Sequence, residues 1–271
     1  GWSGYSGPEL RSDKSDFDYF HQLFLVYGVG IFAGPFWSGV FIIMNRRFRL
    51  RPEATLEQMY LLAVQSVPII VVSLGFVGLM MILELAFHMR LVLKHDALVP
   101  AFSAVLMVRE LGPVITCLLL TSRIGAGIAA EIGTMKVTDQ LDALKMLSID
   151  PWDYLVIPRW LGSVFAAITL TVVSIAVALW GGAVLAIQKL GTSSGEYFNT
   201  VFFFVKFPDV IRCLIKATVF GTLIPVIASY QGFQCARGSA AVGEAATQAV
   251  VRASLAIIVA DFVLTYLFYA I

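Results

Sequence analysis

Long apolar stretches separated by short polar connections dominate the sequence. A helix needs about 20 apolar residues to cross the roughly 30 Å hydrocarbon core of a bilayer, and backbone amides inside lipid must pair within helices or closed barrels. Six stretches reach that length: 22–45, 61–89, 97–130, 160–188, 210–236 and 253–271. The alternating strands that a barrel requires are absent from the sequence. The pattern therefore predicts an all-α integral membrane protein.

The first stretch, 22–45, allows two interpretations. It is uncharged and long enough to span, but Pro35 interrupts a helix, and four arginines follow within 46–51. It can cross the bilayer, or it can lie in the interface as an amphipathic elbow. The spacing of Gly30 and Gly34 is also compatible with close helix packing. The residues alone leave these alternatives open.

Composition agrees with a membrane location and narrows the partners. The 271 residues are 59% hydrophobic and 14% charged, with a mean hydropathy of +0.84, whereas soluble domains are roughly 45–50% apolar and about 25% charged. The net charge of +1 gives no reason to expect a nucleic-acid partner. Cys117, Cys213 and Cys235 are far apart and show no metal-ligand spacing. We expect no metal site, no disulfide and no cofactor bound by this chain.

The basic residues predict the orientation. The polar connections at 46–51, 123–159 and 237–252 carry four, four and two Lys or Arg residues. The alternate connections carry six in all: Arg90, Lys94, Lys189, Lys206, Arg212 and Lys216. Because cytoplasmic loops carry an excess of Lys and Arg, we expect the first set to lie in the cytoplasm.

Charged residues inside the apolar stretches are the candidate functional groups. Arg109, Glu110 and Asp261 lie about ten residues or more from the ends of their stretches, where a charge costs roughly 2.5–3.5 kcal/mol. We expect them to face protein or a wet cavity. For Asp261 we favour a structural tie between two helices, and for Arg109 and Glu110 a cavity that accepts a polar or zwitterionic headgroup. Glu84 lies nearer the end of its stretch, where interface solvation explains it.

The connection at 131–147 predicts a short amphipathic helix at the cytoplasmic ends of two spans. Thr138 is the expected N-cap and Asp139 lies in the expected first turn. Leu141, Leu144 and either Met146 or Leu147 then recur at helical spacing. This apolar face suits headgroups or a soluble partner, whereas a solvated connector is the plainer alternative.

The sequence lacks the motifs of nucleotide hydrolysis and of paired-histidine metal sites. No Gly-x-x-x-x-Gly-Lys-Ser/Thr loop is present, so nucleotide hydrolysis must come from another polypeptide. The histidines form no HExxH pair. We therefore expect a transport subunit and not an enzyme. The alternative is an ion-coupled secondary transporter or channel that uses Glu110 and Asp261 as proton sites.

Several longer motifs resemble those of the MlaE-type permease family. They are RELGPV at 109–114, RIGAGIAAEIGTMKVTDQ at 123–140, DP at 150–151, PR at 158–159, AATQAVV at 245–251 and ADFVLT at 260–265. The resemblance covers roughly 56–268. It is only partial at 232–238 and weak over the first 50 residues.

The resemblance implies a specific assembly. A tail and amphipathic elbow helix would occupy 1–55, and a five-helix permease domain 56–271. The chain would form a homodimer in the inner membrane. Its partners would be a cytoplasmic ABC ATPase that binds ATP and magnesium, an MCE-domain protein and a STAS-domain protein. The complex would move phospholipid between membranes. The lipid cavity would contain Arg109, Glu110, Met81 and Met89. The coupling helix at 131–147 would dock on the ATPase through Glu131, Gly133, Thr134, Met135, Lys136 and Asp139.

Overall fold

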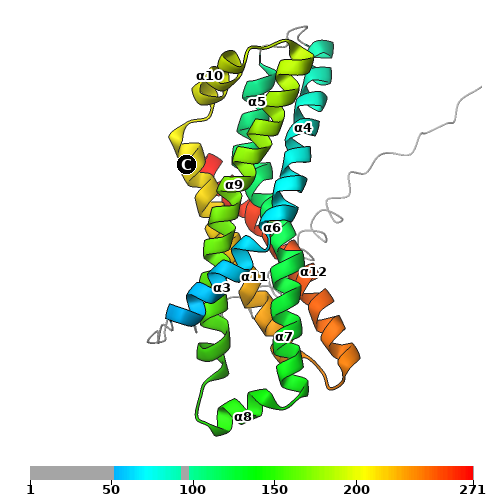
Figure 1. The fold of residues 1–271 in the computed structure, drawn as a ribbon, viewed down its shortest axis with the longest axis vertical. Helices are drawn as coiled ribbons and strands as arrows, with labels where there is room; N and C mark the ends of the chain where they lie inside the picture. The colour runs from blue at the N-terminus through cyan, green and yellow to red at the C-terminus, as the bar shows by residue number, and fades with distance from the viewer. Residues whose placement is uncertain (1–51, 93–97, 271) are drawn as a thin grey trace, which may run out of the picture. The chain divides into compact units, whose positions relative to one another are not determined.

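The computed structural model describes residues 52–92 and 98–270, and the regular elements within these ranges are helices. The predicted elbow at 22–45 lies outside the described residues. Figure 1 shows the arrangement of the described helices. The α-helices are α3 (Pro52–Val64), α4 (Val67–Val92), α5 (Val99–Leu106), α6 (Gly112–Leu120), α7 (Ala126–Val137), α8 (Gln140–Met146), α9 (Ile157–Leu190), α10 (Ser194–Phe204), α11 (Phe207–Gln234) and α12 (Ser239–Ala270). Three π-helical turns, η2 (Met107–Leu111), η3 (Thr121–Gly125) and η4 (Trp152–Val156), extend neighbouring helices.

Five segments of the described chain are long and apolar enough to cross a membrane. They are Val67–Leu91, Val99–Val137, Trp152–Leu190, Phe207–Gln234 and Ser239–Ala270. The prediction of an all-α membrane protein with five spans after the first apolar stretch is confirmed. Four of the five spans are longer than their apolar stretches, and the largest additions are residues 131–137, 152–159 and 239–252, which continue helices instead of forming polar connections.

Helix α9 is the central packing element of this bundle, with α3, α4 and α11 against it (Figure 1). Glycine permits the closest approach, between α4 and α9. A Cβ added to Gly78 would lie 2.1 Å from the carbonyl oxygen of Ala178. Backbones that approach this closely gain van der Waals contacts, which are the main attraction between helices in lipid. Residues with larger side chains at Gly78 would push the two helices apart.

The helices α8 and α10 lie at opposite ends of the bundle (Figure 1). Helix α8 connects α7 to η4 at one end, and α10 connects α9 to α11 at the other. Tyr197 and Val201 of α10 are buried in an apolar cluster with Ile82, Val99 and Ala186. Burial raises the pKa of the Tyr197 hydroxyl to about 12.

The predicted single helix at 131–147 is divided in two by the backbone at Asp139. Residues up to Val137 belong to α7, and only Gln140–Met146 form the short helix α8. The prediction that Thr138 is an N-cap is wrong, because Thr138 ends α7 and its hydroxyl donates to the Thr134 carbonyl at 2.9 Å. Asp139 precedes α8 with a left-handed φ of 56°, a conformation that Asp tolerates better than most residues.

Candidate functional site: a row of ion pairs inside the bundle

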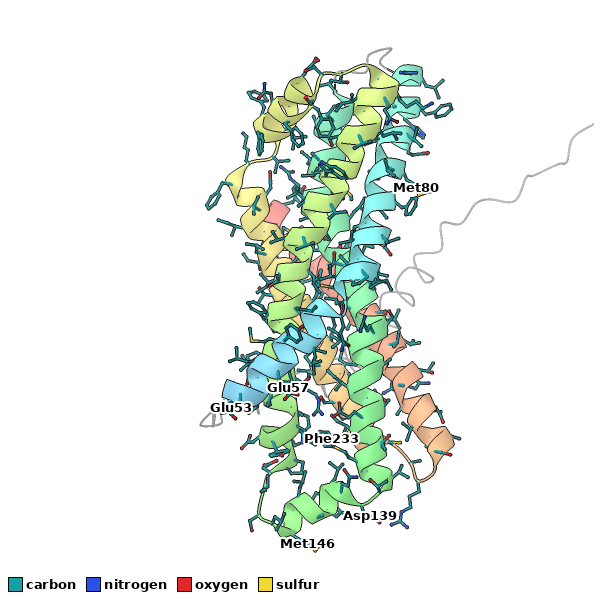
Figure 2. All side chains as sticks on the ribbon, viewed as in Figure 1. Glu53, Glu57, Met80, Asp139, Met146 and Phe233 are labelled. Carbon is teal, nitrogen blue, oxygen red and sulfur yellow. The ribbon has the colours of Figure 1, made fainter. Side chains whose placement is uncertain are left out.

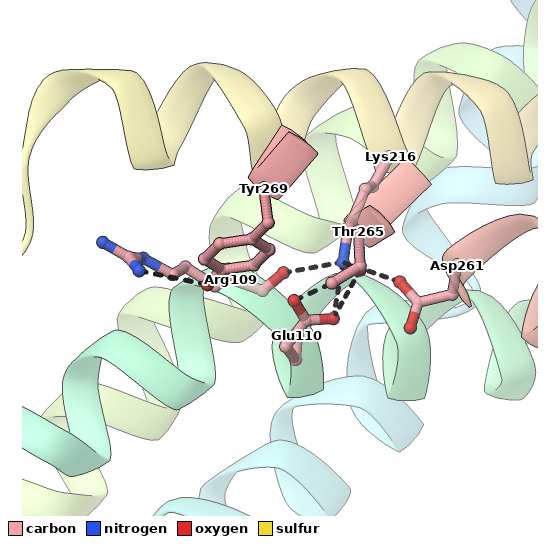
Figure 3. Close-up of polar contacts among 6 residues, drawn as sticks. All are labelled: Arg109, Glu110, Lys216, Asp261, Thr265 and Tyr269. Atoms are coloured by element: carbon pink, nitrogen blue, oxygen red, sulfur yellow. Dashed lines mark hydrogen bonds and ion pairs between the residues drawn. The ribbon is translucent and has the colours of Figure 1, made fainter. Parts of the chain in front are cut away.

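Lys216 of α11 is the centre of the first part of the site (Figure 3). Its side chain is 2% exposed, and its ammonium lies 2.5 Å from Glu110 Oε2 and 2.7 Å from Asp261 Oδ1. The same ammonium donates to Thr265 Oγ1 at 2.7 Å and to the Arg109 carbonyl at 3.1 Å. One buried cation therefore connects η2, α11 and α12.

Asp209 is the centre of the second part. Its side chain is 3% exposed and lies 2.9 Å from Arg109 Nε and 3.7 Å from Arg212 Nη1. Its Oδ2 also accepts the backbone N–H of Lys206 at 3.1 Å, at the start of α11. The Arg109 guanidinium further donates to the Tyr269 hydroxyl at 3.1 Å. We refer to Arg109, Glu110, Asp209, Arg212, Lys216 and Asp261 as the charge row.

The Lys216 part of the charge row lies at a similar depth in three spans, whereas Asp209 is only the third residue of α11. Lys216 is the tenth residue of α11, Glu110 is the twelfth of its span, and Asp261 is the tenth from the end of α12. At 1.5 Å per residue, these positions are roughly 15 Å from the span ends nearest α10. Arg109 and Glu110 both reach α11 and α12 because they share the π-helical turn η2, a local widening of the helix that is frequent at functional sites.

The structure brings three of the predicted charges together and supplies partners that the sequence analysis missed. Asp261 does tie helices together, through its ion pair with Lys216. Lys216 lies within the predicted apolar stretch 210–236, and only its inclusion among the basic residues of a connection is wrong, because it is buried within α11. Asp209 was not identified. The spacing of Asp209, Arg212 and Lys216 at i, i+3 and i+7 places them on one helix face, and this signal was available in the sequence.

The other predicted cavity and membrane residues lie outside the charge row. Glu84 is exposed on α4, with its carboxylate 3.5 Å from His88 Nδ1 one turn away. Met81 and Met89 are half-buried on the same helix. Met89 packs against the apolar cluster that includes Tyr197. No described contact joins either methionine to Arg109 or Glu110, so their place in a lipid cavity stays a prediction.

The residues predicted to couple to an ATPase lie at the α8 end of the bundle, on α7 or next to α8. Five of the six lie on α7, where Glu131 contacts α9 and Lys136 contacts α11. Glu131 pairs with the buried Arg159 at 2.5 Å, and the Lys136 ammonium donates to the Phe233 carbonyl at 2.5 Å. Gly133 is buried beside Cys235, Thr134 is exposed and Met135 is half-buried. Of the six, Asp139 alone directly adjoins α8, and it is exposed.

Helix α8 itself presents apolar side chains at the end of the bundle. Met146 is 81% exposed and Leu147 is 70% exposed. Figure 2 shows Asp139 and Met146 at the two ends of α8, with Phe233 on the bundle side of this helix. A cavity of about 690 Å³ lies between α8 and the residues around Trp152 and Phe233. On the exposed surface of α8, the nearby Lys145 ammonium holds the pKa of Asp142 below its ordinary value.

Five apolar spans with ion pairs enclosed between them define a multi-pass membrane protein of the transport type, since ionised groups inside spans mark substrate or ion pathways. The family model described as Permease MlaE matches residues 55–267. The chain therefore belongs to the MlaE permease family.

Named relatives support this assignment. The chain is 34% identical over 215 residues to the intermembrane phospholipid transport system permease protein MlaE of Haemophilus influenzae, covering 79% of this chain and 82% of the relative. A probable ABC transporter permease protein of Synechocystis is 36% identical, with 88% and 90% covered. One of Rickettsia typhi is 34% identical, with 93% and 96% covered. These names support an ABC permease over an ion-coupled transporter or channel.

Proposed function

We propose that this chain is the membrane-spanning subunit of an ABC transporter that moves phospholipid between membranes. The observation that carries the proposal is the charge row, in which Arg109 and Glu110 remain 30% exposed inside an apolar bundle. A phospholipid needs polar contacts for its headgroup and apolar walls for its tails. The name of the Haemophilus relative supports phospholipid as the cargo.

In this proposal the energy comes from a separate ATPase that docks on α8 in the cytoplasm. The exposed Met146 and Leu147 are the docking side chains, because apolar groups outside the membrane need a cover. Movement of α8 is transmitted through α7, which Glu131 ties to α9 and Lys136 ties to α11. The resemblance further supports a homodimer in the inner membrane, with MCE-domain and STAS-domain partners.

Reconstitution tests the transport proposal. Vesicles that contain the chain and its copurified ATPase should move labelled phospholipid to acceptor vesicles only with ATP. Glu110→Ala and Arg109→Ala should each reduce transport while the complex still assembles. Transport at the wild-type rate in both variants would remove the charge row from the mechanism. ATP-independent transport driven by a proton gradient would support the ion-coupled alternative instead.

Docking of the ATPase is tested separately. Met146→Asp and Leu147→Asp add charges to the exposed surface of α8, so copurification of the ATPase should fall at least tenfold. Leu255→Asn changes a half-exposed position on α12, away from α8, and serves as the control that should keep the ATPase bound. Undiminished copurification in both α8 variants would contradict the assignment of the docking surface.

A further inference from the structure

The charge row contains two buried ions of opposite sign. Lys216 and Asp209 are 2% and 3% exposed, and both lie on α11. They are seven residues apart, which places them on one face of the helix at an axial separation of roughly 10 Å. Ions this deeply buried persist only when other charges compensate them, so each should be considered together with its partners.

The partners of these two ions are more exposed and are arranged in opposite ways. Lys216 holds two carboxylates, from Glu110 at 30% and Asp261 at 21% exposure. Asp209 holds two guanidinium groups, from Arg109 at 30% and Arg212 at 39% exposure. Each buried ion can neutralise only one of its two partners.

The row is therefore neutral as a whole but divided into two poles. The Lys216 pole has two anions and one cation, and so one excess negative charge. The Asp209 pole has two cations and one anion, and so one excess positive charge. Figure 3 draws Arg109 and the Lys216 pole, with the Arg109 guanidinium and Asp261 at opposite ends of the residues drawn. In each pole the excess charge is on the more exposed side chains.

We infer that the charge row selects phospholipids with a zwitterionic headgroup and sets the orientation of that headgroup. The ammonium lies against Glu110 and Asp261, and the phosphate lies against Arg109 and Arg212. This inference rests on the proposed function, because it names the class of phospholipid that the same site accepts. The two buried ions are roughly 10 Å apart along α11, so the two poles are separated along the helix, as the phosphate and the ammonium of such a headgroup are separated by its linker.

An anionic phospholipid without an ammonium matches only half of the row. Its phosphate can pair with the Asp209 pole, but the excess negative charge at the Lys216 pole stays uncompensated beside it. Complementary charges favour the correct ligand, and unmatched charges reject the wrong one. A single charge-assisted hydrogen bond contributes enough to change a binding ratio about tenfold.

The test measures lipid retained from a mixed membrane. The full chain, with the subunits that copurify with it, is placed in nanodiscs of equal amounts of phosphatidylethanolamine and phosphatidylglycerol. After extraction into detergent, mass spectrometry of the intact complex counts the lipids that stay bound. The wild-type protein should retain phosphatidylethanolamine over phosphatidylglycerol by about tenfold.

Two neutralising substitutions should change this ratio in opposite directions. Asp261→Asn removes the excess negative charge and should raise the share of phosphatidylglycerol severalfold. Arg212→Gln removes the excess positive charge and should lower that share further. Both variants should fold, because Lys216 keeps Glu110 and Asp209 keeps Arg109 as partners. Glu196→Gln and Lys189→Gln make the same charge changes at exposed positions outside the row and should leave the ratio unchanged.

The outcomes separate this inference from the proposed function. If the wild-type protein retains phospholipid but both row variants keep the wild-type ratio, or shift it in the same direction, the inference is wrong and lipid transport still stands. A wild-type preference for phosphatidylglycerol overturns it as well. If the wild-type complex retains no phospholipid, the proposed function itself fails.

Discussion

Replacing Lys216 with methionine should strongly destabilise the bundle. The methionine keeps an unbranched apolar side chain but removes the ammonium that contacts Glu110, Asp261, Thr265 and the Arg109 carbonyl. Breaking a buried ion pair by removing one partner costs about 3–5 kcal/mol, since the remaining charge stays desolvated. Glu110 and Asp261 are 30% and 21% exposed, so we expect the lower end, about 3 kcal/mol.

The assay is thermal unfolding in detergent, followed by tryptophan fluorescence. At about 2–4 °C per kcal/mol for a domain of this size, the midpoint should fall by roughly 6–12 °C. A triple variant with Lys216→Met, Glu110→Gln and Asp261→Asn removes the uncompensated carboxylates and should recover most of the loss. A midpoint within about 2 °C of wild type for Lys216→Met alone would refute the electrostatic reasoning, as would a triple variant no more stable than the single one.

Two further predictions concern the packing of the bundle. Gly78→Ala should lower stability by about 1–3 kcal/mol through overpacking, because its Cβ would lie 2.1 Å from the Ala178 carbonyl oxygen. Gly127→Ala, where nothing described lies within 4 Å, should be neutral or stabilising by up to about 1 kcal/mol; equal midpoints for the two variants would contradict the close approach. Burial raises the pKa of Tyr197 to about 12, compared with about 10 in the unfolded chain. The stability that comes from burying the neutral hydroxyl is therefore complete below about pH 10 and is lost as the pH rises toward 12. Tyr197→Phe should therefore unfold with less dependence on pH between about 10 and 12 than wild type, and identical pH profiles would show that the hydroxyl is not held neutral by the fold.

The apolar pattern predicted the five spans because the cost of exposing backbone groups to lipid leaves little choice of structure. The same pattern predicted span ends poorly. Residues 239–252 contain Glu244 and Arg252 and were assigned to a polar connection, yet they belong to α12. A helix can continue beyond the bilayer, so hydropathy marks the part inside lipid and not the end of the helix.

The charge row shows a second limit of the sequence. The cost of burying Arg109, Glu110 and Asp261 indicated that each needs a partner, and this was correct. The partners could not be identified, because pairing depends on which faces of α11 and α12 meet η2. Lys216 lies inside the predicted apolar stretch 210–236, yet it was counted with a connection, because hydropathy does not distinguish a buried lysine from one near a helix end.

The buried pair of Lys216 and Asp261 also has a consequence for biogenesis. Each residue alone raises the cost of inserting its helix by roughly 2.5–3.5 kcal/mol at the centre of a span, whereas the two together neutralise one another. Helices α11 and α12 are joined by only a few residues, from Cys235 to Gly238, so they can leave the insertion machinery as a hairpin with this pair already formed. Glu110 then completes the pairing from a helix synthesised earlier. The last quarter of the chain thus enters the bilayer as one unit, and a ribosome that stalled between the two helices would leave Lys216 without Asp261.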